Sequence, residues 1–109
     1  MVTLAVNPYA ESDDVPRELI KLDKYIKDNY DTMDTFELAA YIFAETVRIH
    51  PFYDSNGRIS RLFTEQFLLS KGFRLMKWPE ETLYRKVCTQ KQMADALREN
   101  AILENNKNT

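Results

Sequence analysis

The sequence of 109 residues suits a single domain over positions 1–109, and 44% hydrophobic residues, with six Phe, six Tyr and one Trp, can fill a core. Its formal net charge of −2 disfavours broad nucleic-acid binding, which needs a basic face. One cysteine excludes an intrachain disulfide, and the sequence shows neither a signal-peptide pattern nor an apolar run of about 20 residues. We therefore expect no nucleic-acid or membrane partner and a cytoplasmic location, with delivery into a host cell left open.

The N-terminal part of the chain predicts one strand and one helix. Residues 2–6, Val-Thr-Leu-Ala-Val, are the only stretch with strand character, and an Asn-Pro pair ends it. Asp14 and Pro16 are typical of a helix start, because acidic side chains and Pro are both favoured in the first turn. The apolar spacing that follows predicts a helix to about Asp28.

Two apolar helices are predicted in the middle of the chain. The segment Asp34 to Glu37 resembles a capping box and opens a helix to about Ile49, which we expect to be central and buried. A loop over residues 50–57 interrupts the pattern. A second helix is predicted over residues 58–70, and Gly72 follows it as a C-terminal cap.

The C-terminal part predicts two further helices, over about residues 80–88 and 91–103, before a polar tail at 104–109. Residues 89–92 would cap the second of these helices. Cys88 is expected in the core, since no second histidine exists to pair with it as a nucleophile. The predicted fold class is therefore all-α, with one short N-terminal strand.

The twelve residues from His50 to Arg61 hold the only histidine and one of the two glycines of the chain. Arg58 and Arg61 fall three residues apart in the first turn of a predicted helix, where cations are mildly unfavourable unless an anion is bound. Free backbone N–H groups at that helix start, together with Gly57, would cradle a phosphate. Arginine forks add bidentate contacts to phosphate oxygens.

Two further polar residues of the segment suit phosphoryl chemistry. Asp54, beside the cradle, is the kind of ligand that Mg²⁺ takes next to a polyphosphate. A neutral imidazole at His50 could accept a proton from an attacking hydroxyl near pH 7. Each residue alone has a structural explanation: a histidine at a helix end, a turn at residues 54–57, and solvated arginines. Their joint spacing favours the site over those explanations.

Seven of these residues match, in order and spacing, the signature of the Fic family: His50, Phe52, Asp54, Asn56, Gly57, Arg58 and Arg61. The resemblance covers about residues 2–73 and implies a compact Fic-like helical core with a short flap strand at its N-terminus. In that core Phe52 would anchor the loop. The flap, which would clamp the backbone of a target protein as an added strand, corresponds to Thr3, Leu4, Ala5 and Val6.

The resemblance implies AMPylation, in which AMP passes from ATP to a Ser, Thr or Tyr hydroxyl of a target protein and pyrophosphate leaves. His50 would deprotonate the hydroxyl, and Asp54 would hold Mg²⁺ or Mn²⁺ between the phosphates. The phosphates themselves would be bound by Ser55, Asn56, Gly57, Arg58 and Arg61. Gly57 favours nucleotidyl transfer over kinase activity, because the kinase branch of the family has Lys at that position.

Departures from the family pattern leave alternatives open. Ser55 stands where the family usually has Gly, and the chain is short, so the site could be a silent nucleotide-binding or interaction module. Another phosphate-linked group, such as UMP, GMP or phosphocholine, could replace AMP. The inhibitory motif of the family is not found in the sequence, which makes an antitoxin-like partner a hypothesis and leaves a homo-oligomer open.

Overall fold

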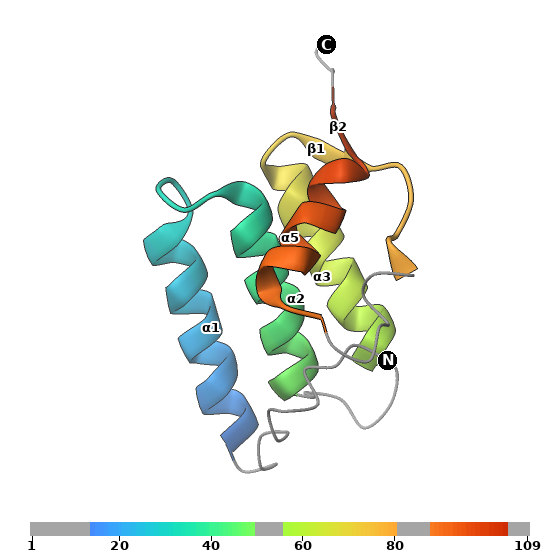
Figure 1. Cartoon of the computed structure of the whole chain (residues 1–109). Coiled ribbons are helices and arrows are strands. Elements are labelled where there is room, and N and C mark those ends of the chain that lie inside the picture. The colour runs from blue at the N-terminus through green and yellow to red at the C-terminus, as the bar shows by residue number, and fades with distance from the viewer. Residues whose placement is uncertain (1–13, 50–55, 81–87, 105–109) are drawn as a thin grey trace.

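A computed structural model describes residues 14–49, 56–80 and 88–104 of the chain (Figure 1). Its elements are α1 (Val15–Asn29), α2 (Thr35–Ile49), α3 (Asn56–Ser70), β1 (Phe73–Leu75), α5 (Gln90–Glu99) and β2 (Ala101–Leu103). The all-α fold class is confirmed, since helices dominate and the only sheet in the described ranges has two short strands. The predicted flap strand, the 105–109 part of the tail and most of the helix predicted over 80–88 lie outside these ranges.

Helix α2 is the centre of the packing, as its sequence predicts. It contacts α1, α3 and α5, and its side chains are buried on several sides of the helix. A helix that is apolar over most of its circumference must be covered on most sides, which only a central position provides. The hydrophobic core consists mainly of Phe36, Leu38, Ala39, Ala40, Ile42, Phe43, Val47, Phe67, Leu68, Trp78, Met93, Ala94 and Leu97.

The start of α2 is capped as predicted and tied to α5. The Asp34 carboxylate accepts the backbone N–H groups of Phe36 at 3.1 Å and Glu37 at 3.0 Å, which have no partner inside the helix. The same oxygen accepts a hydrogen bond from the Arg98 guanidinium of α5 at 2.8 Å. One carboxylate therefore caps one helix and joins it to another.

Helix α1 packs along α2 and touches the far end of α3. Leu22 is its buried residue, and the ring of Tyr25 stacks on Tyr41 of α2 with 4.0 Å between centroids. At its C-terminal end, Tyr30 meets Phe67 edge to face at 5.8 Å. These contacts cover the apolar face that the spacing of α1 predicted.

The C-terminal part differs from the prediction of a helix that continues to residue 103. Helix α5 begins with the expected capping box at Thr89 but ends at Glu99. Residues 101–103 form β2, which pairs antiparallel with β1 in the register Phe73 with Leu103. Gly72, at φ +89°, turns the chain out of α3 into β1, the role expected of a C-terminal glycine. The strand forms because its partner, distant in sequence, satisfies its backbone.

The three helices α1, α2 and α3 run alternately up and down (Figure 1). As a result the start of α1, the end of α2 and the start of α3 lie at one end of the molecule, drawn at the bottom of Figure 1. The small sheet lies at the opposite end. In the sequence, residues 50–55 lie between the end of α2 and the start of α3.

Candidate functional site

The predicted site straddles the connection between α2 and α3. Helix α2 ends at Ile49 and α3 begins at Asn56. His50, Phe52, Asp54 and Ser55 fall between them and lie outside the described residues, as do the flap residues 3–6. Their predicted roles stay predictions. The structure brings the two helix ends that carry the segment to the same end of the molecule.

Helix α3 begins two residues earlier than the predicted start at Arg58. Asn56 and Gly57 therefore belong to its first turn rather than to a loop. The backbone N–H groups at the start of a helix have no acceptor within it, and they carry its partial positive charge. Here those groups belong to the signature residues themselves. The first turn also contains no acidic residue that would compete with an anion.

The longer helix also corrects the expected position of Arg61. With Asn56 as the first residue, Arg58 lies in the first turn and Arg61 in the second. Arg58 is exposed. The Arg61 side chain, 46% exposed, donates from Nε to Glu65 Oε2 at 3.2 Å, and its guanidinium lies over the Trp78 ring. Arg61 therefore points toward the segment that follows β1.

A pocket of about 570 Å³ lies beside Arg61. It is lined by Arg61, Met76, Lys77, Trp78, Pro79, Glu80 and Asn100. Lys77 adds a second cation, and Asn100 is fixed because its amide donates to the Ala96 carbonyl at 2.8 Å. The pocket thus combines two cations, one carboxylate and one oriented amide.

Trp78 forms the inner wall of this pocket. It is 4% exposed and meets Phe43 of α2 edge to face at 5.2 Å. Its indole Nε1 is buried and has no hydrogen-bond partner within residues 14–49, 56–80 and 88–104. The sequence indicated only packing or an interface for Trp78 and no role for Lys77. A Trp next to a lysine was the available signal, but the pocket depends on Arg61 of α3 and on Asn100, which directly follows α5, and both are distant in sequence.

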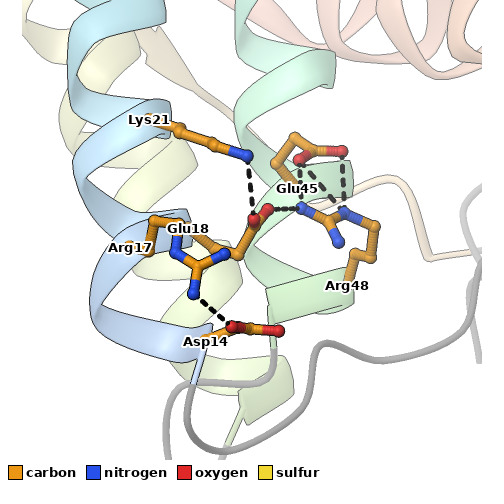
Figure 2. Close-up of polar contacts among 6 residues, drawn as sticks. All are labelled: Asp14, Arg17, Glu18, Lys21, Glu45 and Arg48. Atoms are coloured by element: carbon orange, nitrogen blue, oxygen red, sulfur yellow. Dashed lines mark hydrogen bonds and ion pairs between the residues drawn. The ribbon is translucent and has the colours of Figure 1, made fainter.

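A cluster of charged side chains lies at the C-terminal end of α2, the end that precedes His50 (Figure 2). It consists of Arg48, Glu45, Glu18 and Lys21. Arg48, in the last turn of α2, binds Glu45 through Nη2 at 2.9 Å and Nε at 3.1 Å. Its Nη2 also contacts the carboxylate of Glu18 on α1, which Lys21 reaches at 3.3 Å. Hydrogen bonds to Glu45 and Glu18 raise the pKa of Arg48, and the bond from Arg48 lowers the pKa of Glu18. Sequence reasoning missed this cluster.

No group of three or more His, Cys, Asp or Glu that could hold a metal occurs among the described residues. Asp54, the predicted Mg²⁺ ligand, lies outside those residues, so the Mg²⁺ site stays a prediction. Within the same residues, no helix combines the length and the apolar character that crossing a membrane requires.

A family model describes part of the chain. The model of the Fic/DOC family matches residues 2–68, more than half of the sequence. This range holds the segment from His50 to Arg61, both helices α1 and α2, and most of α3. No curated protein and no solved structure matches the chain at a significant level.

Proposed function

Because the chain belongs to the Fic/DOC family, whose members are generally transferases of the AMPylation type, we propose that it transfers AMP from ATP to a hydroxyl of a target protein. One observation carries the proposal. The family match spans the whole segment from His50 to Arg61, and α3 begins inside that segment, at Asn56. The signature residues therefore supply the anion-binding end of a helix.

The proposed reaction is a displacement at the α-phosphorus of ATP. The imidazole of His50 accepts the proton of a Ser, Thr or Tyr hydroxyl, whose oxygen attacks the phosphorus. A new oxygen–phosphorus bond forms, and the bond from the α-phosphorus to the oxygen that bridges to the β-phosphate breaks. Pyrophosphate leaves, and the target retains AMP as a phosphodiester. A neutral imidazole is the side chain best suited to accept a proton near neutral pH.

The phosphates are proposed to lie at the start of α3. Backbone N–H groups of Asn56 and Gly57 would receive the α-phosphate, with Ser55 in the position before them. Arg58 and Arg61 would bind the β- and γ-phosphates as bidentate donors. Support comes from the location of Arg61 beside a pocket that also holds Lys77, because a polyphosphate is stabilised where cations gather.

The proposed metal is Mg²⁺, with Mn²⁺ as a substitute. Asp54 would hold it together with phosphate oxygens, and when bound it supplies positive charge that offsets the charge of the polyphosphate. The chain itself would contribute the Asp54 carboxylate to the metal, and the guanidinium groups of Arg58 and Arg61 to the phosphates. This ligand set fits a hard cation that keeps most of its shell outside the protein.

Two protein partners are proposed. The target would pair its backbone with the flap residues Thr3 to Val6, as an added strand. The Fic/DOC family is often paired with antitoxins, and we propose that a partner of this kind restrains the present chain. Support for the second partner comes from this pairing within the family.

The test is transfer of label from ATP labelled on the α-phosphate. The purified chain, Mg²⁺ or Mn²⁺ and a cell lysate are incubated beside the variant His50→Ala. Labelled protein bands that vanish in the variant would support AMPylation. Label that persists with His50→Ala would contradict the assignment of the base. Absence of label, with ATP still bound in calorimetry, would instead favour another donor or a silent binding module.

A further inference from the structure

We propose that Arg48 is a positioning residue for the transfer reaction. It fixes the C-terminal end of α2 against α1, and α2 ends one residue before His50. The inference rests on the proposed function and adds a residue to its site. Arg48 touches neither nucleotide nor target in this proposal. It acts by holding the helix end from which His50 is presented.

The contacts of Arg48 cross between two helices. Its guanidinium is bonded on one side to Glu45, within α2, by Nη2 at 2.9 Å and Nε at 3.1 Å. The same Nη2 contacts Glu18 Oε1, in the first turn of α1. Figure 2 shows the guanidinium between the two carboxylates, with Lys21 on the outer side of Glu18. The planar fork of Arg is suited to bridge two carboxylates in fixed directions.

The pair of Arg48 and Glu18 is more shielded than the ion pairs that lie within α1. The side chains of Arg48 and Glu18 are 22% and 17% exposed, whereas those of Lys27 and Asp23 are 74% and 63% exposed. Shielded, charge-assisted bonds keep more of their strength than pairs in open solvent, which contribute little. Both charges also suit their helices, since Glu18 lies near the start of α1 and Arg48 near the end of α2.

The location of the cluster gives it a consequence for the site. Helix α2 ends at Ile49, so only that residue separates Arg48 from His50. Helix α1 is the helix that follows the predicted flap. The bond between Arg48 and Glu18 therefore joins α2, which directly precedes the proposed base, to α1, which follows the predicted target-binding flap. Misplacement of a reacting group by about 1 Å can lower a rate by about a hundredfold.

The experiment compares Arg48→Met, Glu18→Gln and the double variant with the control Lys27→Met, all in the full chain. We expect kcat for AMP transfer to fall about ten- to a hundredfold with Arg48→Met, while the dissociation constant for ATP changes less than about twofold. The double variant should be no slower than Arg48→Met alone. Lys27→Met, which removes the exposed pair with Asp23, should keep the wild-type kcat.

A second readout does not depend on activity. His50 is the only histidine, so its imidazole C2–H proton gives one resolved NMR signal. Glu18→Gln, a change on α1 far away in sequence, should move or broaden this signal, and Lys27→Met should not. An unchanged kcat in Arg48→Met would overturn the positioning role, and so would an unchanged His50 signal in Glu18→Gln. Parallel losses of kcat and ATP affinity would overturn it as well, since they indicate general damage.

The measurements distinguish failure of the proposed function from failure of the positioning role of Arg48. If the wild-type chain transfers no AMP, the proposed function fails, and the NMR signal of His50 then decides the positioning role alone. If the wild type is active and Arg48→Met is equally active, only the positioning role fails. Circular dichroism at the assay temperature shows whether each variant is folded, and Glu18→Gln serves where Arg48→Met does not fold.

Discussion

The guanidinium of Arg61 lies over the indole ring of Trp78, with 5.3 Å between the guanidinium carbon and the ring centroid. This cation–π contact joins the second signature arginine, on α3, to the segment between β1 and residue 80. The Glu65 carboxylate, one turn further along α3, accepts a hydrogen bond from Arg61 Nε at 3.2 Å. Both contacts keep Arg61 at the edge of the pocket, where the proposed triphosphate would meet it.

Arg61→Ala should weaken ATP binding about ten- to a hundredfold, because hydrogen bonds to a charged group contribute about 1.5–3 kcal/mol. Isothermal calorimetry with ATP and Mg²⁺ measures the change. The matched control is Glu65→Gln, which removes the ion pair but keeps the guanidinium, and it should bind ATP at least as tightly as the wild type. Equal affinity of Arg61→Ala and wild type would contradict the phosphate role.

Lys77→Met tests whether the pocket beside Arg61 receives the phosphates. Removal of a cation from the pocket wall should lower the affinity for ATP severalfold, and more at low ionic strength, since screening weakens the attraction. Lys91→Met is the control: Lys91 is exposed on α5 and does not line the pocket. The same affinity in both variants at low salt would place the phosphates elsewhere.

His50→Ala should lower the transfer rate by about a hundredfold to ten-thousandfold, the usual contribution of a positioned base. The thermal midpoint should change little, because the proposed role of the imidazole is to accept a proton from the target hydroxyl and not to support the fold. Rates come from α-labelled ATP, and midpoints from circular dichroism. A large fall of the midpoint would show that the His50 side chain supports the fold. The lower rate of the variant would then follow from loss of folded protein and would not support the role of His50 as the base.

Leu97→Ala tests the core around α2 and α5. Leu97 is fully buried, so its truncation should cost about 2–5 kcal/mol of unfolding free energy. Leu103→Ala removes the same atoms from a residue that is 71% exposed on β2, and it should cost less than about 0.5 kcal/mol. Denaturant unfolding measures both. Similar losses in the two variants would contradict the assigned core.

The lowered pKa of Glu18 predicts a stability difference that depends on pH. The carboxyl group is more acidic in the folded chain than its ordinary value of 4.5, chiefly because Arg48 donates to it. The bond therefore stabilises the fold above the unfolded pKa, and the contribution is lost as the pH falls through the folded pKa. Wild type should be more stable than Glu18→Gln at pH 7, and the two should converge once the pH has fallen below the folded pKa of Glu18. A constant difference would rule out this bond as its source.

The sequence by itself determined the helices and the candidate segment. Apolar spacing and caps placed α1, α2 and α5 to within a few residues, because the residues that start a helix and the face that it buries are local properties. The spacing from His50 to Arg61 indicated the family, which the match over residues 2–68 confirmed. The start of α3 was missed by two residues, because Asn56 and Gly57 are typical of turns and favour a loop when read alone.

Only the tertiary structure decided the features that join distant parts of the chain. Residues 101–103 become a strand because β1, distant in sequence, supplies hydrogen-bond partners, whereas their local pattern allowed a helix. Arg61 meets Trp78, and Arg48 meets Glu18, because α2 brings α1, α3 and α5 together around it. No periodicity in the sequence encodes such pairs. They follow from which apolar faces pack, and packing is a property of the whole chain.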